Sequence, residues 1–422
     1  MNMPPASQPC LITTHGDLYE NDKLSIRTCF ESGNATIIRV VESEDVLEIQ
    51  FAATPTEAPE ASWFNFKVQV KQRTLMTKLR CVLHFYETQL GGHIGIGIKG
   101  FAPVYCTEAG NEWRRINNAR SRHSESGLLL IEWELPTNEG EVQTALSYPY
   151  TSEDANTLLH NVAPRLKVEA IGVTGMGSAI NRLYNQAKPK ADQAALKPPG
   201  VYCLARQHAS ETPAAWVLDG FLREMVRRDD APMTWAVPFV DVDGCRKGNP
   251  GKDSHPWDFN RAWGSKLYPQ GLLRKYGSHP MRHEVKCIQY DMQRWVKQCN
   301  PLLVIDFHSP IVGDMSGMFL FLRKLTEDML PDEQHRPFID LIAAKLPKEF
   351  RSDKFVRSGQ YPSRWSTARL GDFANDALNV PSITIETPYA RSMVMTFSIE
   401  NYQCAGKLIA ESICDAIATS SE

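Results

Sequence analysis

A histidine and a glutamate, His208 and Glu211, lie three residues apart where the strand-like run VYCLA (201–205) ends and a helical pattern begins. At such a turn, an imidazole nitrogen and a carboxylate oxygen can bind the same metal ion. The motif is weakly specific by itself, because a polar residue followed by a carboxylate that the helix dipole favours looks the same. A metal site is predicted only if a further ligand exists.

Asp306-Phe307-His308 supply this ligand at the end of the apolar run LLVIDF. A strand that ends in a histidine delivers the imidazole to the sheet edge where α/β proteins bind ligands. Taken alone, a histidine after a strand is more often a hydrogen-bonded structural residue. Together, His208, Glu211 and His308 form a set of two histidines and one glutamate, which is typical of catalytic zinc with one position open for water.

Two more segments carry groups that suit hydrolysis at a metal. Glu386 ends the β-branched run PSITIE, and a carboxylate there must be hydrogen-bonded, paired or used chemically. Beside zinc it would be the general base. In residues 257–263 (WDFNRAW), Asn260 and Arg261 can hold a carboxylate through charge-assisted hydrogen bonds. The structural alternative for this segment is an ion pair between Arg261 and Asp258.

The order of these motifs resembles that of the zinc metallocarboxypeptidases of the carboxypeptidase A clan, most closely the cytosolic branch. RQHASET (206–212) is similar to the zinc-ligand motif of this branch, and DVDG (241–244) with DFNR (258–261) to its substrate-binding stretch. FESGN (30–34), WFNF (63–66) and YPY (148–150) resemble landmarks of the β-rich domain that precedes the catalytic domain in that branch. The resemblance therefore covers nearly the whole chain.

The resemblance implies a role for each of these residues. It implies that zinc is bound by His208, Glu211 and His308. It further implies that Asn260 and Arg261 bind the terminal carboxylate of the substrate and that Glu386 is the general base and acid.

Three features depart from the family pattern or have no clear match in it. The usual Asn-Pro-Asp-Gly is DVDG here, a change that affects only a turn. Lys252 is nearest to the position of the arginine that polarises the scissile carbonyl, with Arg246 farther back. Tyr361 is the candidate for the tyrosine over the active site.

Arginines in the loop before Glu386 suggest which substrates are preferred. Arg369, with Arg357 and Arg364, lies where this clan shapes the pocket for the departing side chain. The resemblance therefore implies a preference for acidic C-terminal residues. The structural alternative is that these arginines are solvated in a polar loop.

Two kinds of pattern divide the chain. Residues 24–150 contain short runs that alternate apolar and polar side chains, separated by turn-rich intervals such as ESGN, which predicts an all-β sandwich domain over residues 1–155. In residues 156–422, strands alternate with helices predicted at 212–228, 284–299 and 399–418. This predicts an α/β domain in which a mixed sheet is flanked by helices, as in zinc carboxypeptidases.

Composition excludes several classes of protein. The 422 residues carry a net charge of −3, which lacks the basic excess that binding to nucleic acid requires. No apolar run approaches the ~18 residues that span a bilayer, and the N-terminal residues lack the pattern of a secretory signal, so no membrane partner is expected. The 10 cysteines include no Cys-x-x-Cys pair and are expected to be reduced thiols of a cytoplasmic protein.

These observations predict a zinc-dependent carboxypeptidase whose partner is the C-terminus of a peptide or protein. Two alternatives remain open: a zinc amidohydrolase that acts on small N-acyl amino acids, and a binding module whose metal site is vestigial. His279 and His283 are expected to be surface residues rather than ligands, because Pro280 between them prevents one shared helical face. The oligomeric state is not predicted.

Overall fold

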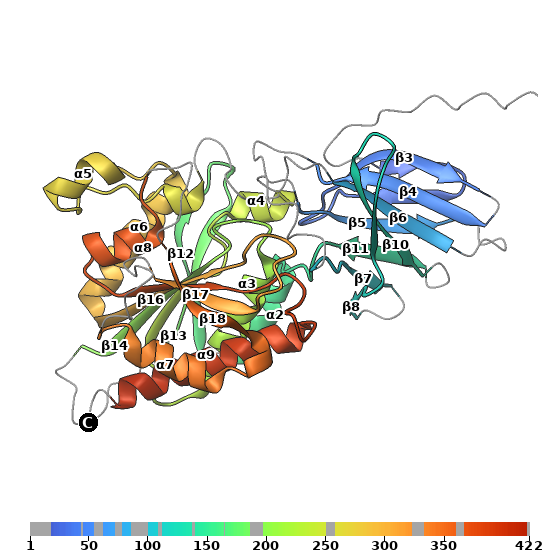
Figure 1. Ribbon diagram of the computed structural model, residues 1–422. Helices are drawn as coiled ribbons and strands as arrows, with labels where there is room; N and C mark the ends of the chain where they lie inside the picture. Colours follow the sequence, from blue (N-terminus) through green and yellow to red (C-terminus); the bar gives the residue numbers. More distant parts are fainter. Residues whose placement is uncertain are drawn as a thin grey trace, which may run out of the picture.

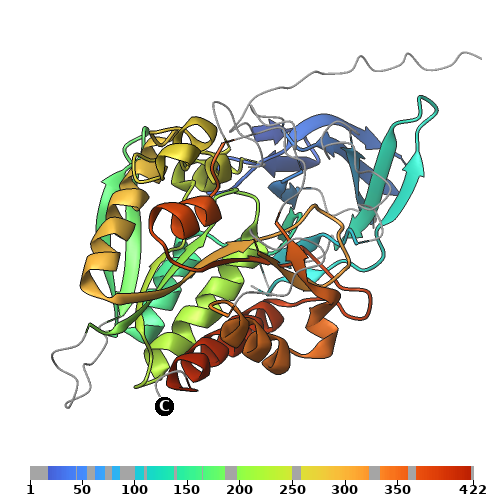
Figure 2. The ribbon, with the colours of Figure 1, turned by 60° about the vertical axis from the view of Figure 1, so that its left-hand side comes forward.

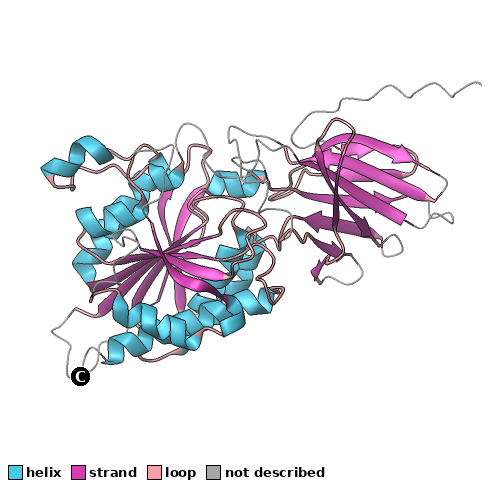
Figure 3. Ribbon diagram, viewed as in Figure 1, coloured by secondary structure: helices cyan, strands magenta, loops and turns pink. Residues whose placement is uncertain are grey.

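The structure is a computed structural model, and it describes most of the 422 residues of the chain. The described residues are 18–43, 45–54, 62–71, 78–85, 100–108, 112–136, 140–163, 165–185, 197–249, 258–322, 333–359 and 367–419. Two facing β-sheets form one part of the molecule, and a third, larger sheet with helices on both faces forms the other (Figures 1 and 3).

The first two sheets form the predicted sandwich. One contains, in spatial order, β1 (Leu18–Glu20), β2 (Leu24–Arg27), β5 (Asn65–Val70), β11 (Glu141–Ala145), β7 (Val104–Thr107) and β8 (Arg114–Arg115). The other contains β3 (Thr36–Glu42), β4 (Val46–Ala52), β6 (Lys78–Phe85), β10 (Leu129–Leu135) and β9 (Arg120–His123). Buried aromatic rings of Phe51, Phe64 and Trp133 meet between the sheets, with 5.5 Å between the centroids of Phe64 and Trp133. One of the alternating runs of the β-rich part, HIGIGIKG (93–100), lies outside the described residues, apart from Gly100.

The third sheet is mixed, as expected. Its spatial order is β12 (Leu166–Val173), β13 (Ala179–Asn185), β15 (Met233–Val237), β14 (Pro199–Ala205), β16 (Asn300–His308), β19 (Ser382–Glu386), β17 (Met318–Leu322) and β18 (Arg351–Ser358). Strands β15, β14, β16 and β19 are parallel, whereas β17 runs antiparallel to β19. The carboxyl ends of the parallel strands therefore meet at one edge, where sheets of this kind bind ligands.

Helices cover both faces of this sheet (Figure 2). They are α2 (Ser152–Val162), α3 (Thr212–Arg227), α4 (Val242–Lys247), α5 (Gln270–Tyr276), α6 (His283–Gln298), α7 (Arg336–Lys345), α8 (Leu370–Asp372) and α9 (Ile399–Thr419), with short turns η2 (Phe259–Arg261), η3 (Lys348–Phe350) and η4 (Phe373–Ala377). Alternate side chains of β14 point to opposite faces of the sheet, and both faces are covered by helices. Val201 and Cys203 join the core beneath α3, α7 and α9, whereas Tyr202 and Leu204 pack with α6.

Close packing of α3 on α9 depends on two glycines. A Cβ atom at Gly220 would lie 2.0 Å from the Gln403 carbonyl oxygen, and one at Gly406 would lie 1.9 Å from that of Val217. The backbones of α3 and α9 can lie this close together because neither glycine has a side chain.

The predicted helices at 212–228, 284–299 and 399–418 are confirmed as α3, α6 and α9. The hairpin of β12 and β13 was not predicted, because many of its side chains are polar or exposed and it contributes little to the core. Among the described residues, no helix combines the length and the apolar character that crossing a bilayer requires. The cysteines that the structure describes are all free thiols.

Candidate metal centre and active site

The three predicted metal ligands come together at the carboxyl edge of the third sheet. His208 Nδ1 lies 2.9 Å from Glu211 Oε1, and His308 Nδ1 lies 2.7 Å from Glu211 Oε2. The ligand atoms of the three residues all lie within 4.8 Å of one another. All three side chains are buried, and two imidazole nitrogens and a carboxylate suit a divalent metal such as zinc.

Backbone geometry positions these ligands. Arg206 follows β14 with a φ of 58°, in the left-handed region, and turns the chain toward the metal centre. Its guanidinium holds the turn through hydrogen bonds to the carbonyl oxygens of Ala209 and Tyr150, at 2.8 and 3.0 Å. Glu211 then occupies the N-cap position of α3, which begins with a proline in its first turn. His308 is the last residue of β16.

A carboxylate holds the outer nitrogen of each histidine. Asp258 Oδ1 lies 3.1 Å from His208 Nε2, and Asp306 Oδ2 lies 3.0 Å from His308 Nε2. Each carboxylate accepts the Nε2 proton, so each Nδ1 lone pair is directed toward the centre of the cluster. Such partners fix the tautomer and the orientation of metal-binding histidines.

Charge in the cluster strongly favours a cation. Burial lowers the pKa of His208, but Glu211 and Asp258 outweigh it and raise the pKa to about 10. Burial also acts to lower the pKa of His308, yet Asp306 and Glu211 raise it well above its ordinary value. Three carboxylates thus surround two imidazoles, and their negative potential attracts protons or a metal ion.

Glu386 lies at the same edge of the sheet, because it ends the strand next to β16. In the parallel register of β16 and β19, Glu386 is opposite His308. Directly paired residues project to the same face, so the carboxylate of Glu386 and the imidazole of His308 share one face of the sheet. Its side chain is only partly buried. This position suits a group that exchanges a proton with water at the metal.

Asn260 and Arg261 lie in the turn η2, which Asp258 caps through a 2.7 Å hydrogen bond from the Asn260 backbone amide. Asn260 Nδ2 lies 3.2 Å from Asp306 Oδ2, and Asn260 Oδ1 accepts a 3.0 Å hydrogen bond from the backbone amide of Leu370. Arg261 Nη1 donates to the carbonyl oxygen of Asn260 at 2.8 Å. The turn therefore joins the metal-binding residues to the segment that contains Arg369.

Two of the three arginines expected near a side-chain pocket are described. Arg369 precedes α8, and its Nη1 donates to the carbonyl oxygen of Gly359. The Arg357 guanidinium stacks on the ring of Phe319, 3.5 Å from its centroid, and Phe319 is opposite Glu386 in the register of β17 and β19. Burial lowers the pKa of Arg357, while the negative charges of Asp314 and Glu386 oppose this shift. Arg357 is thus electrostatically coupled to Glu386.

Three predicted residues cannot be placed. Lys252, Tyr361 and Arg364 lie outside the described residues. Their predicted roles, as carbonyl-polarising group, active-site tyrosine and pocket arginine, stay predictions. His279 and His283 are exposed, as expected for surface residues.

The DVDG segment forms a structural turn. Asp241 caps α4 and accepts a 2.9 Å hydrogen bond from the backbone amide of Gly244. A Cβ atom at Gly244 would lie 2.0 Å from Asp241 Oδ2, so the turn requires glycine there. Asp243 accepts a 2.9 Å hydrogen bond from Thr174 Oγ1. Both carboxylates of this segment thus support the backbone.

Sequence reasoning missed the network behind the ligands. Gln207 Nε2 donates to both oxygens of Asp306 at 2.9 Å, and Gln207 Oε1 accepts from Trp263 Nε1 at 2.9 Å. Ser210 Oγ lies 3.2 Å from the hydroxyl oxygen of Tyr389. The only sequence signal for these residues is that each lies within a few positions of a predicted site residue.

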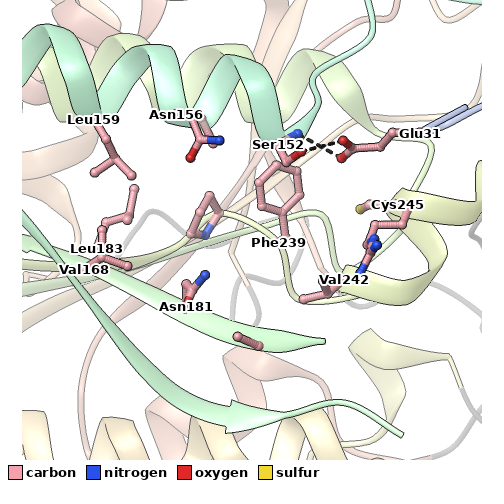
Figure 4. Close-up of a pocket in the computed structure, with 14 residues that line it drawn as sticks. Glu31, Ser152, Asn156, Leu159, Val168, Asn181, Leu183, Phe239, Val242 and Cys245 are labelled. Carbon is pink, nitrogen blue, oxygen red and sulfur yellow. Dashed lines mark hydrogen bonds between the residues drawn. The ribbon is translucent and has the colours of Figure 1, made fainter. Parts of the chain in front are cut away.

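A separate pocket, with a volume of about 140 Å³, is lined mainly by α2, the hairpin of β12 and β13, and α4, with Glu31 of the β-sandwich at one side (Figure 4). Leu159, Leu183 and Phe239 contribute to its apolar lining. Its carboxylate Glu31 is engaged by the backbone amide and hydroxyl of Ser152. Burial raises the pKa of the Cys245 thiol to about 12, so the thiol stays protonated. This pocket has no activated group and does not compete with the metal centre as an active site.

Comparisons with solved structures define the class of this fold. The metallo-carboxypeptidase from Burkholderia cenocepacia matches with a TM-score of 0.71 at 18% identity, over 94% of this chain and 99% of that chain. A metallo-carboxypeptidase from Pseudomonas aeruginosa matches with a TM-score of 0.69 at 20% identity, over 93% of this chain and 99% of that one. The chain has the fold of these metallo-carboxypeptidases over nearly its whole length, and the resemblance that the motifs indicated is confirmed.

A curated relative with a similar sequence is a cytosolic carboxypeptidase. Cytosolic carboxypeptidase 6 of Caenorhabditis elegans is 22% identical over 308 residues, which are 68% of this chain and 62% of that protein. The chain thus matches less than two thirds of the length of this relative. No family model matches the chain.

Proposed function

We propose that this protein is a zinc-dependent carboxypeptidase that removes C-terminal residues from peptides or proteins. The convergence of His208, Glu211 and His308 carries this proposal, because it forms a metal centre at the ligand-binding edge of a metallocarboxypeptidase fold. Glu386, on the same face and in register with His308, supplies the carboxylate that the chemistry requires.

Each of the site residues has its own role in the proposed hydrolysis. His208, Glu211 and His308 would hold zinc, which when bound would lower the pKa of water and polarise a carbonyl group. Glu386 accepts the proton of the attacking water and passes it to the nitrogen of the departing amino acid. The guanidinium of Arg261 holds the terminal carboxylate, which places the last peptide bond at the centre. Lys252 would stabilise the negative charge that develops on the carbonyl oxygen.

The relatives support this activity and a cytoplasmic location. The C. elegans protein is named a cytosolic carboxypeptidase, and the free thiols of the described cysteines suit a reducing compartment. The P. aeruginosa enzyme was solved with (2-guanidinoethylmercapto)succinic acid, a dicarboxylate. A site that accepts such a compound suits a substrate with a free carboxylate terminus.

The test is mass spectrometry of a mixed peptide library after incubation with the zinc-loaded protein. We expect loss of single residues from the C-terminus and no internal cleavage. Hydrolysis of N-acyl amino acids without any trimming of peptides would instead identify a zinc amidohydrolase. Binding of peptides without turnover of either substrate would identify a binding module.

Replacement of Arg261 by alanine should destroy the selectivity for a free C-terminus. A charge-assisted hydrogen bond is worth roughly 1.5–3 kcal/mol, so kcat/KM on a free-acid peptide should fall at least about tenfold. The rate on the C-terminally amidated twin should change little, because the amide never engages the guanidinium charge. The measurement compares both peptides for wild type, for Arg261→Ala and for the control Arg294→Ala, which removes an exposed arginine paired with Glu169. Equal wild-type rates on both peptides would refute exopeptidase action.

A further expectation concerns the C-terminal residue that the enzyme removes. Arg369 lies next to Leu370, whose backbone amide bonds to Asn260, and Arg357 is coupled to Glu386. Both guanidinium groups are partly buried, so pairing with a substrate carboxylate would be partly desolvated and stronger than an exposed ion pair. These contacts favour an acidic C-terminal residue as the substrate.

Peptides that end in Glu, Gln, Leu or Lys should therefore differ in kcat/KM, with Glu fastest. Added salt should reduce the advantage of Glu over Gln, since it screens the charges. Arg369→Gln should narrow the same gap several-fold and leave the rate on the Leu peptide nearly unchanged. Faster release of Leu than of Glu by the wild type would overturn this preference and leave the carboxypeptidase activity intact.

A further inference from the structure

The loop between Glu386 and α9 carries an arginine, Arg391, whose guanidinium has no counter-charge among the described residues. Arg391 is partly buried, and its Nε atom is inaccessible to solvent and makes no hydrogen bond. Throughout the described chain, no carboxylate or carbonyl group engages its guanidinium. A partly buried charge without a counter-charge is costly, so such an arrangement needs an explanation.

A second arginine, Arg115 at the end of β8, contacts the same loop. Its Nε donates to the carbonyl oxygen of Phe397 at 3.2 Å, and its Nη1 to that of Ala102 at 2.7 Å. The guanidinium stacks on the ring of Tyr148, 4.4 Å from the centroid, and its Nη2 is buried without a hydrogen bond. These partners are neutral, so the positive charge of Arg115 is not compensated by any described residue.

The loop brings the two charges together. Arg391 pairs with Thr396 across the loop, and the backbone amide of Phe397 donates to the carbonyl oxygen of Ala390 at 2.8 Å. Phe397, whose carbonyl oxygen binds Arg115, therefore lies across the loop from Arg391. Burial lowers the pKa of Arg391, and the charge of Arg115 lowers it further, with no acidic group acting in the other direction. Two like charges held in this way form a site that an anion would stabilise.

The same loop is tied to the metal centre. The backbone amide of Thr387 donates to the carbonyl oxygen of His308 at 2.8 Å, and the Tyr389 hydroxyl lies 3.2 Å from Ser210 Oγ, between two metal ligands in the sequence. Arg391 follows Glu386 by only five positions, so their Cα atoms are at most about 18 Å apart. An extended substrate of about five residues could span this distance.

We propose that Arg391 and Arg115 form a binding site for a carboxylate of the substrate that lies several residues upstream of the scissile bond. This inference rests on the proposed carboxypeptidase function. The site differs from the one that holds the terminal carboxylate, because it lies on the loop after Glu386 and uses an arginine of the β-sandwich. It gives the β-sandwich a direct part in the recognition of substrates with acidic tails.

The experiment uses the zinc-loaded full chain and a series of peptides with one fixed C-terminal residue. Each peptide carries either Glu or Gln at one of the positions two to six residues upstream. At one or two of these positions we expect the wild type to show a KM about tenfold lower for Glu than for Gln, with similar kcat. Arg391→Gln should abolish this difference, Arg391→Lys should retain part of it, and the all-Gln peptide should be unaffected.

Two further variants act as controls. Arg165→Gln removes an arginine that donates to the Val226 carbonyl oxygen far along the chain from this loop, and it should behave as wild type. Arg115→Gln should match Arg391→Gln in KM, and its thermal unfolding reports whether the contact between the domains survives. Equal KM values for Glu and Gln at every upstream position in the wild type would overturn the proposal.

Two additional measurements separate the possible outcomes. Inorganic phosphate is the probe for binding of a free anion. If it raises the unfolding temperature of wild type but not of Arg391→Gln, while the Glu and Gln peptides behave alike, the site binds free anions and the substrate role is refuted. If the wild type hydrolyses no peptide, binding of a fluorescent acidic peptide to Glu386→Gln protein still tests the site. Binding that Arg391→Gln weakens about tenfold would support the carboxylate site even though the proposed function had failed, and binding that Arg391→Gln leaves unchanged would overturn the site as well.

Discussion

Glu386→Gln should keep the fold and its zinc but lose turnover, with kcat reduced by about 10²–10⁴-fold or more. The amide has nearly the shape of the carboxylate but cannot accept the proton of the attacking water. Because the same group is proposed to return the proton to the leaving amine, one substitution blocks two steps. The substrate should still bind, so KM should change far less than kcat.

A matched control is Glu224→Gln. Glu224 is a buried carboxylate of the same domain, but it lies 12 positions along α3 from Thr212, about 18 Å from the metal end of the helix, and pairs with the exposed Arg227. Its rate should stay near that of wild type. The test measures kcat and KM on a free-acid peptide for both variants, and the zinc content of each by elemental analysis. A Glu386→Gln enzyme with near-normal kcat and full zinc would remove Glu386 from the catalytic role.

The second large effect is expected for His308→Ala, which should lose most of its bound zinc. Removal of one of three ligands leaves His208 and Glu211, a set that cannot hold zinc tightly at neutral pH. It also leaves Asp306 buried without the imidazole that it contacts at 3.0 Å, which weakens the network further. Activity should fall to the background in parallel with the metal content.

Elemental analysis after dialysis gives the zinc content of each variant. His279→Ala is the control, since it removes an exposed histidine that lies outside the cluster, and it should retain about one zinc per chain. Full stoichiometric zinc in His308→Ala would exclude His308 as a ligand. Circular dichroism of both variants separates loss of metal from loss of fold.

Much of the fold follows from local patterns. Alternation of apolar and polar residues predicted the sandwich, and apolar runs such as LLVIDF predicted the buried parallel strands, because a strand covered on both faces must be apolar throughout. The hairpin of β12 and β13 escaped prediction because it lies at the border of the sheet, where only part of each strand is buried. The pattern of apolar and polar residues reflects which side chains are buried, so a weakly buried element has only a weak pattern.

The sequence alone determined which residues can do chemistry and their order along the chain: His208 and Glu211, then Asn260 and Arg261, then His308, then Glu386. Residue types limit which atoms can bind metal, accept a proton or hold a carboxylate, and strand ends limit where such groups occur. The structure places all of these residues at one edge of the sheet or in the turn η2 bonded to it. Their roles stay predictions until the variants are measured.

Only the tertiary structure decided which groups touch. The pairing of Asp258 with His208, of Asp306 with His308 and of Gln207 with Trp263 joins segments that are distant in sequence. The proximity of Arg115 and Arg391 depends on how the β-sandwich packs against the loop before α9. The physical reason is that parallel strands set their register through long crossovers, so contacts at their ends depend on the packing of the whole sheet and its helices, which no local pattern encodes.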